Sequence, residues 1–212
     1  MEILCHRGYW KEENERNTIK SIRAALESGR GIESDIRDLD KMLVISHDLP
    51  DKQSPMAEEV FKLMAEYENK YCFAINIKSD GLKDILMEQL QKYHIVNYFV
   101  FDMSVPQIIE YQEKGIRYYT RQSEYEKQPV LYREAAGVWI DAFEDDSWIT
   151  EELIYEHQKN GKKICVVSPD LHQRDNIIFW NRLLTFKINW QEIMLCTDYP
   201  DDAISFFEKN KE

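Results

Sequence analysis

Short apolar runs rich in β-branched and aromatic residues alternate along the chain with longer segments whose apolar residues recur every three or four positions. The short runs predict β-strands, and the spaced segments predict amphipathic helices. The predicted strands are Glu2–Cys5, Ile32–Ile36, Met42–Ser46, Cys72–Ile77, Tyr98–Phe101, Ile116–Thr120, Gly137–Ile140, Lys163–Val167 and Ile193–Cys196. The predicted helices are Thr18–Ser28, Glu58–Asn69, Leu82–Lys92, Val105–Lys114, Trp148–Asn160, Asp175–Phe186 and Asp202–Lys209.

One predicted strand differs from the others in its connection. Met42–Ser46 follows Ile32–Ile36 after the polar segment Arg37–Lys41, so we interpret it as the return arm of a β-hairpin. Eight strands followed by helices remain, which is typical of an α/β fold of the (β/α)8 TIM-barrel type. A doubly wound open sheet is the alternative, because alternation does not show that a sheet closes.

The length and composition favour a single domain. The chain has 212 residues with seven glycines, six prolines and no low-complexity linker, so we expect one domain covering residues 1–212. A TIM barrel typically has about 250 residues. The prediction is therefore a trimmed barrel with a small β-hairpin extension after the second strand.

Charge and hydropathy exclude some partners. The formal charge of −12 disfavours nucleic acid and anionic lipid surfaces. No apolar run approaches the roughly 20 residues that cross a bilayer, and the first residues become polar too early for a signal peptide. The four cysteines stand singly in or beside apolar runs, which is typical of reduced core thiols. We therefore expect a cytoplasmic protein with no membrane partner.

Polar residues that could catalyse a reaction or bind a ligand gather in or just after the first strands and the hairpin arm. They are His6, Arg7, Glu33, Asp35, His47, Asn76 and Lys78. In a TIM barrel the loops at the carboxyl ends of the strands converge on one mouth, where catalysis occurs. The pattern therefore predicts a site that combines imidazoles, cations and carboxylates.

Glu33 and Asp35 are two residues apart, so in a strand they point to the same face. Two acids on an inward face need a positive charge beside them, and oxygen ligands favour Mg²⁺ or Ca²⁺. The alternatives are an exposed edge strand, or a buried ion-pair network with Arg7, Arg37 or Lys78.

Two of the five histidines are candidate catalysts. His6 and His47 follow predicted strands on the acid-bearing rim, and a pair of imidazoles can divide proton acceptance and proton donation. His94 lies in a helix-to-strand connection and His157 near the end of a predicted helix, where its charge would suit the helix dipole. We interpret both as structural.

These residues resemble the signature of the glycerophosphodiester phosphodiesterase family, which belongs to the superfamily of phosphatidylinositol-specific phospholipase C-like phosphodiesterases. The matching motifs are His6-Arg7-Gly8, Asn17-Thr18, Glu33-Ser34-Asp35, His47-Asp48 and Thr197-Asp198-Tyr199-Pro200-Asp201. The resemblance implies a metal-dependent phosphodiesterase in which His6 and His47 are general acid and base. It further implies that Arg7 holds the phosphate and that Glu33 and Asp35 bind the cation.

The sequence departs from the family at the third strand, where a glutamate is usual two residues before the lysine. Lys78 keeps its place as a phosphate-binding candidate, but Asn76 replaces the acid. An amide oxygen can still bind Mg²⁺ or Ca²⁺, so we expect a metal site of Glu33, Asp35 and Asn76 with lowered affinity. The alternative is a phosphate-binding and metal-binding module that has lost its turnover.

Three further residues at predicted strand ends are candidates for substrate contact, with loop capping as the alternative: Asp102, Asp141 and His172. The short loops favour a small soluble substrate, either a glycerophosphodiester or a sugar-linked diester. Direct attack by water and formation of a cyclic phosphate remain open, as do the natural substrate, the roles of the two histidines and the oligomeric state. A structural scaffold is a third function class, since aromatic residues make up 12% of the chain.

Overall fold

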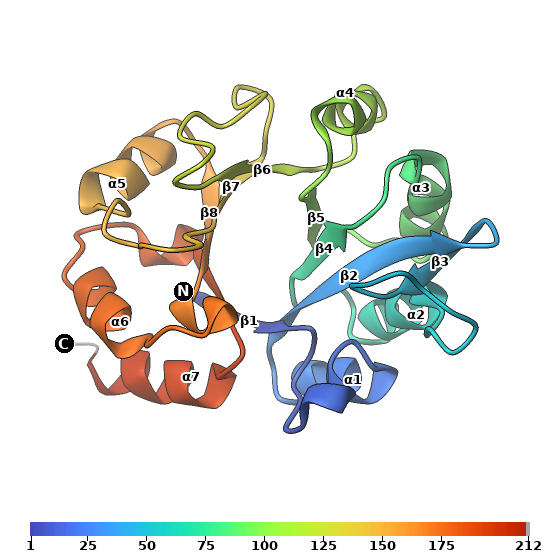
Figure 1. Cartoon of the computed structure of the whole chain (residues 1–212), viewed down its shortest axis with the longest axis horizontal. Coiled ribbons are helices and arrows are strands. Elements are labelled where there is room, and N and C mark those ends of the chain that lie inside the picture. The colour runs from blue at the N-terminus through green and yellow to red at the C-terminus, as the bar shows by residue number, and fades with distance from the viewer. Residues whose placement is uncertain (211–212) are drawn as a thin grey trace. The chain divides into compact units, whose positions relative to one another are not determined.

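The computed structural model describes residues 1–210, and its elements follow the alternation of the sequence (Figure 1). The strands are β1 (Glu2–His6), β2 (Gly31–Leu39), β3 (Met42–Ile45), β4 (Phe73–Ile77), β5 (Tyr98–Phe101), β6 (Tyr119–Gln122), β7 (Gly137–Ile140), β8 (Lys163–Val167) and β9 (Ile193–Thr197). The helices are α1 (Ile19–Glu27), α2 (Ala57–Glu66), α3 (Lys83–Lys92), α4 (Val105–Glu113), α5 (Glu151–Lys159), α6 (Ile177–Leu184) and α7 (Pro200–Lys209). Three short 3₁₀ helices are η1 (Glu13–Glu15), η2 (Pro169–His172) and η3 (Trp190–Glu192).

The strand order is β5-β4-β2-β1-β9-β8-β7-β6, with β3 paired to β2 outside this path. The pairs β2–β4, β4–β5, β6–β7, β7–β8 and β8–β9 are parallel, whereas β3 runs antiparallel to β2. The antiparallel arm confirms the predicted hairpin. Helices separate the successive parallel strands except β6 and β7, as is typical of the predicted barrel class.

The chain divides into two compact units. One is Cys5–Tyr118, and the other is Met1–Leu4 with the chain from Tyr119 onward. In the Cys5–Tyr118 unit, α1 packs on β2 and α2 packs on β3. The other unit buries a core of aliphatic and aromatic side chains from β7, β8 and β9 and from α5, α6 and α7, with Trp180 at 1% exposure among the largest. The prediction of one domain over residues 1–212 stays a prediction.

Local signals explain where the helices begin and end. Thr18 caps α1 by accepting the Ser21 N–H, and Ser104 caps α4 by accepting the Gln107 N–H. Gly29, which follows α1, has a φ of +80°, a conformation that suits glycine at a helix end.

One repeat of the expected alternation differs from the prediction. The fifth barrel strand along the chain is β6, which begins at Tyr119 rather than Ile116, and no helix occurs between it and Gly137 among the described residues. Ser123 instead accepts the Glu126 N–H with its hydroxyl and forms a turn directly after the strand. The expectation of eight strands each followed by a helix is therefore wrong at this repeat.

The four cysteines are free and buried, which confirms the expected core thiols. Their positions are Cys5, Cys72, Cys165 and Cys196. Within residues 1–210, none of the helices is both long enough and apolar enough to span a bilayer.

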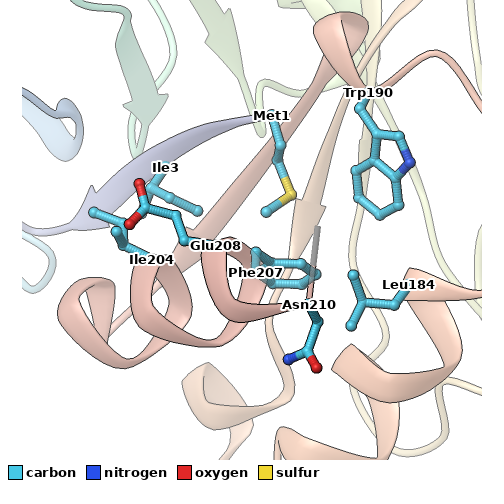
Figure 2. Close-up of a pocket in the computed structure, with 8 residues that line it drawn as sticks. All are labelled: Met1, Ile3, Leu184, Trp190, Ile204, Phe207, Glu208 and Asn210. Atoms are coloured by element: carbon cyan, nitrogen blue, oxygen red, sulfur yellow. The ribbon is translucent and has the colours of Figure 1, made fainter. Parts of the chain in front are cut away.

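A cavity of about 450 Å³ opens in the unit that contains β7 to β9, and Figure 2 shows its lining. Apolar side chains make up most of the wall, and Trp190 and Phe207 are its aromatic members. Glu208 and Asn210 are the polar residues among the eight that line it. None of these eight lining residues, all from the described part of the chain, has a basic side chain that could bind a phosphate group.

Candidate active site

The turn after β1 brings two residues with positive φ against the start of α1. Arg7 has a φ of +57°, and Gly8 follows with a φ of +89°. A Cβ atom at Gly8 would lie 2.6 Å from Oγ of Ser21, so this position has no room for a side chain. The turn therefore fixes the guanidinium of Arg7 and the imidazole of His6 next to β2.

Glu33 and Asp35 lie on one face of β2, and both are buried, with 1% and 0% exposure. In the parallel register Glu33 pairs with Ala74, and Asp35 pairs with Asn76. Paired residues on neighbouring strands share a face, so the amide of Asn76 lies on the same face as the two acids. Lys78 directly follows β4 and is two residues after Asn76, so alternation places its side chain on the same face.

Three side chains surround the carboxylate of Asp35. Nε of Arg7 lies 3.0 Å from Oδ2, and Nζ of Lys78 lies 3.4 Å from Oδ1. Nδ2 of Asn17 donates a hydrogen bond of 2.8 Å to Oδ2. The ion-pair network considered from the sequence therefore exists around Asp35. Its third candidate, Arg37, instead donates to the backbone carbonyl of His47.

Glu33 has fewer positive contacts. The backbone N–H of Arg7 donates to Oε2 of Glu33 over 3.1 Å, and Nε2 of His6 lies 3.9 Å from the same oxygen. Burial raises the pKa of Glu33 to about 7, with a further increase from the negative charge of Asp35; His6, Arg7 and Lys78 oppose the shift. A buried acid with a pKa near neutrality is typical of a functional site.

The donor atoms on this face fit a hard cation. Oδ1 of Asp35 and Oδ1 of Asn76 are both buried and accept no hydrogen bond from residues 1–210. Asp35 and Asn76 are paired in register, and Glu33 is two residues before Asp35 on the same face. Two carboxylates and an amide are oxygen ligands of the kind that Mg²⁺ and Ca²⁺ accept. Among the described residues, no group of three or more His, Cys, Asp or Glu side chains forms a metal site.

A backbone hydrogen bond of the preceding residue holds His47 near this cluster, whereas the His47 side chain contacts Asp48. The N–H of the preceding residue, Ser46, donates to the carbonyl of Asp35 over 3.1 Å. The His47 imidazole is 44% exposed and lies 2.9 Å from Oδ1 of Asp48. This hydrogen bond, together with the charges of Arg7 and Arg37, lowers the pKa of Asp48. The imidazole is therefore open to solvent, as a proton-transfer group must be to reach a substrate.

The remaining candidates have different surroundings. Asp102, which has a φ of +69° directly after β5, lies 3.8 Å from Nζ of Lys78 and so belongs to the same cluster. Asp141 and His172 lie in the other unit, where Nε2 of His172 is 2.6 Å from Oδ1 of Asp141. Their assignment as substrate contacts stays a prediction.

One central residue received no role of its own from the sequence. Asn17 lies just before α1, and a polar residue at that place is also typical of a helix cap. Thr18 takes that capping role, and Asn17 contacts Asp35 instead. A sequence pattern does not separate these two neighbours, because both suit the position before a helix.

Comparison with known proteins bears on the fold of the chain. No family model matches the chain, and no curated protein matches it. Among solved structures, a glycerophosphodiester phosphodiesterase from Parabacteroides distasonis aligns with a TM-score of 0.73 at 14% identity, covering 100% of this chain and 98% of that one. The glycerophosphodiester phosphodiesterase of Thermotoga maritima aligns with a TM-score of 0.67 at 20% identity, covering 96% and 97% of the two chains.

The chain has the TIM-barrel fold of the glycerophosphodiester phosphodiesterases. An Oleispira antarctica phosphodiesterase in complex with its product sn-glycerol-3-phosphate also aligns, with a TM-score of 0.69 at 15% identity, and 98% of this chain and 97% of that one are covered. The predicted barrel class is confirmed, and the doubly wound alternative is excluded. At these identities the likeness concerns the fold, so the activity must be argued from the site itself.

Proposed function

We propose that the protein is a phosphoric diester hydrolase of the glycerophosphodiester phosphodiesterase type that cleaves a small soluble phosphodiester with a divalent cation. The observation that carries the proposal is the buried pair Glu33 and Asp35, held by Arg7 and Lys78 with the imidazole of His6 beside it. The fold supports the same conclusion, since four solved phosphodiesterases share it over nearly their whole length.

Each residue of the cluster has a task in this chemistry. Glu33, Asp35 and Asn76 would hold Mg²⁺ or Ca²⁺, whose charge offsets the negative charge that develops on the phosphoryl oxygens. The guanidinium of Arg7 and the ammonium of Lys78 would bind the phosphate, and each is about one-fifth exposed and so accessible. His6 and His47 would act as general acid and general base, one accepting the proton of the attacking hydroxyl and the other protonating the departing alkoxide.

The substrate is proposed to be a glycerophosphodiester or a sugar-linked diester. A neighbour of the same fold binds sn-glycerol-3-phosphate as its product, so this fold accommodates a glycerol phosphate. Asp102 in the cluster, and Asp141 with His172, are the proposed contacts for the rest of the substrate. Four free, buried thiols are typical of a reducing compartment and support the proposed cytoplasmic location.

The test is turnover of bis-(p-nitrophenyl) phosphate and of a glycerophosphodiester panel with Mg²⁺, Ca²⁺ or Mn²⁺. We expect cation-dependent release of a phosphomonoester, and loss of that activity on chelation with EDTA. His6→Asn is expected to remove the activity, whereas the same exchange at His94, in a turn before β5, serves as the matched control. Folded protein that turns over no diester with any of the cations would contradict the proposal.

A phosphate-binding and metal-binding module is the second candidate, favoured by the amide of Asn76 in place of a third acid on the inner face. In that case sn-glycerol-3-phosphate binds, and neither wild type nor any variant shows turnover. Wild-type turnover that His6→Asn abolishes would exclude the module.

A further inference from the structure

Asn17 joins two parts of the proposed site that come from different segments of the chain. Its backbone N–H donates to the carbonyl of Arg7 over 2.9 Å, and its side-chain amide donates to Oδ2 of Asp35 over 2.8 Å. One residue therefore holds both the turn that carries the phosphate-binding arginine and the carboxylate beside it.

The side chain of Asn17 is itself fixed from the other direction. Its Oδ1 accepts a hydrogen bond of 2.9 Å from Oγ of Ser34 and one of 3.4 Å from the backbone N–H of Asp35. The residue is only 9% exposed and has a φ of +57°, a left-handed conformation that asparagine tolerates better than most residues. An amide fits here because it donates on one side and accepts on the other.

We propose that Asn17 is a positioning residue that sets the orientation of the Asp35 carboxylate relative to Arg7. The inference rests on the proposed function, since it concerns the same site. Oδ2 of Asp35 takes the hydrogen bond from Asn17 and the contact with Arg7, which turns Oδ1 toward Lys78 and the side of the proposed cation. Without the Asn17 donor, the carboxylate loses the bond that fixes this rotation.

The exchange Asn17→Asp tests the contact between Asn17 and Asp35. It keeps the size of the side chain, the left-handed backbone and the two acceptor contacts, but it removes the donor and places a second carboxylate against Asp35. Residues that support a catalytic group in this way typically contribute about 10- to 100-fold in activity. We therefore expect kcat to fall by about 10- to 100-fold with KM within threefold of wild type.

Asn69→Asp is the matched control. Asn69 also has a left-handed backbone, with a φ of +55°, and its side-chain amide donates to the carbonyl of His94 away from the site. The kcat of this variant should stay within twofold of wild type. Circular dichroism at the assay temperature shows whether each variant is folded, so a purely structural role would lower the melting temperature and leave the kcat of the folded protein unchanged.

A second measurement does not depend on turnover. If Asn17 acts through Asp35, the exchanges Asn17→Asp and Asp35→Asn restore an amide-carboxylate pair when combined, so the double variant should lose less in melting temperature than the sum of the two single losses. Additive losses in melting temperature, or a kcat of Asn17→Asp within threefold of wild type, would overturn the inference. Absence of turnover in wild type would contradict the proposed function instead, and the melting experiment would still test the pairing.

Discussion

Arg7 contacts Asp35 with its side chain, and its backbone N–H donates a hydrogen bond to the nearby carboxylate of Glu33. Nε of Arg7 lies 3.0 Å from Oδ2 of Asp35, and the Arg7 N–H donates to Glu33 over 3.1 Å. Arg7 makes both contacts directly after β1, with a left-handed backbone of φ +57°. Strain of this kind persists where surrounding structure holds it, and it concentrates at functional sites.

The buried charges around Asp35 predict a large loss of stability for Asp35→Asn. The exchange leaves the guanidinium of Arg7 without its carboxylate partner and Lys78 with Asp102 alone. Breaking a buried pair on one side typically costs about 3 kcal/mol, so we expect a decrease of that size in the free energy of unfolding, measured with urea.

Asp84→Asn provides the control for that exchange. Asp84 is 74% exposed and pairs with Lys114 over 3.1 Å. An exposed pair contributes under about 1 kcal/mol. Equal losses for the two variants would contradict the assignment of Asp35 as the buried centre of the network.

The close packing of Gly8 predicts that Gly8→Ala is strongly destabilising. The new methyl group would overlap the first turn of α1 in addition to requiring a positive φ. Gly81 also has a positive φ, of +86°, but no atom lies within 4 Å of the place its Cβ would take. We expect a loss of about 3 kcal/mol at Gly8 and about 1 kcal/mol at Gly81, measured by thermal or urea unfolding. Equal effects would show that packing against α1 adds nothing.

The buried imidazole of His157 predicts a pH-dependent stability. Its Nε2 lies 2.7 Å from Oε1 of Gln122, so it donates there, and Nδ1 accepts from the hydroxyl of Tyr132 over 2.9 Å. Burial lowers the pKa of His157 from 6.5 to about 4, with Lys162 contributing. The unfolded chain therefore binds the proton more readily, and the stabilisation present above pH 6.5 is lost as the pH falls toward 4.

The measurement is the difference between wild type and His157→Gln in the free energy of unfolding from pH 7 to pH 4. This difference should shrink by about 2 kcal/mol on acidification, because the variant carries no titrating group at this position. A difference that stays constant with pH would show that His157 is not held neutral. From the sequence we expected a structural role for His157 because a positive charge suits a helix end. The structural role agrees with the hydrogen bonds to Gln122 and Tyr132, but the imidazole is buried and its pKa is lowered, so it is neutral rather than charged at pH 7.

The sequence predicted those residues of the site whose positions depend on the geometry of a single β-strand. Glu33 and Asp35 are two residues apart on an apolar strand, so their shared face follows from the period of a β-strand. The role of Asn17 did not follow, because its partner Asp35 is 18 residues away and a residue before a helix normally caps it. At β6 the apolar residue Ile116 suggested an earlier start, whereas pairing with Gly137 on β7 places the strand at Tyr119.

The amide of Asn76 predicts a weak affinity for the cation, which one substitution should raise. Asn76→Asp adds a carboxylate at a buried oxygen that accepts no hydrogen bond from the described part of the chain. Cation affinity rises with the number of charged ligands, so the Mg²⁺ concentration at half-maximal activity should fall about tenfold. Asn97→Asp, at an exposed amide that donates to the carbonyl of Lys70, is the control and should leave it unchanged. An unchanged Mg²⁺ requirement in Asn76→Asp would remove Asn76 from the proposed ligands.

Phosphorus NMR of sn-glycero-3-phosphocholine incubated with the protein and Mg²⁺ in oxygen-18 water tests the central claim most directly. The account predicts that the diester signal is replaced by a phosphomonoester signal with wild-type protein and persists with His6→Asn. A cyclic phosphate has a phosphorus signal of its own and carries no oxygen-18 until water opens it, so its transient appearance would show attack by a substrate hydroxyl. Direct attack by water gives the oxygen-18-labelled phosphomonoester without that signal. If the diester signal stays unchanged with folded wild-type protein across the panel of diesters and cations, the cluster of Arg7, Glu33, Asp35 and Lys78 is not a phosphodiesterase site.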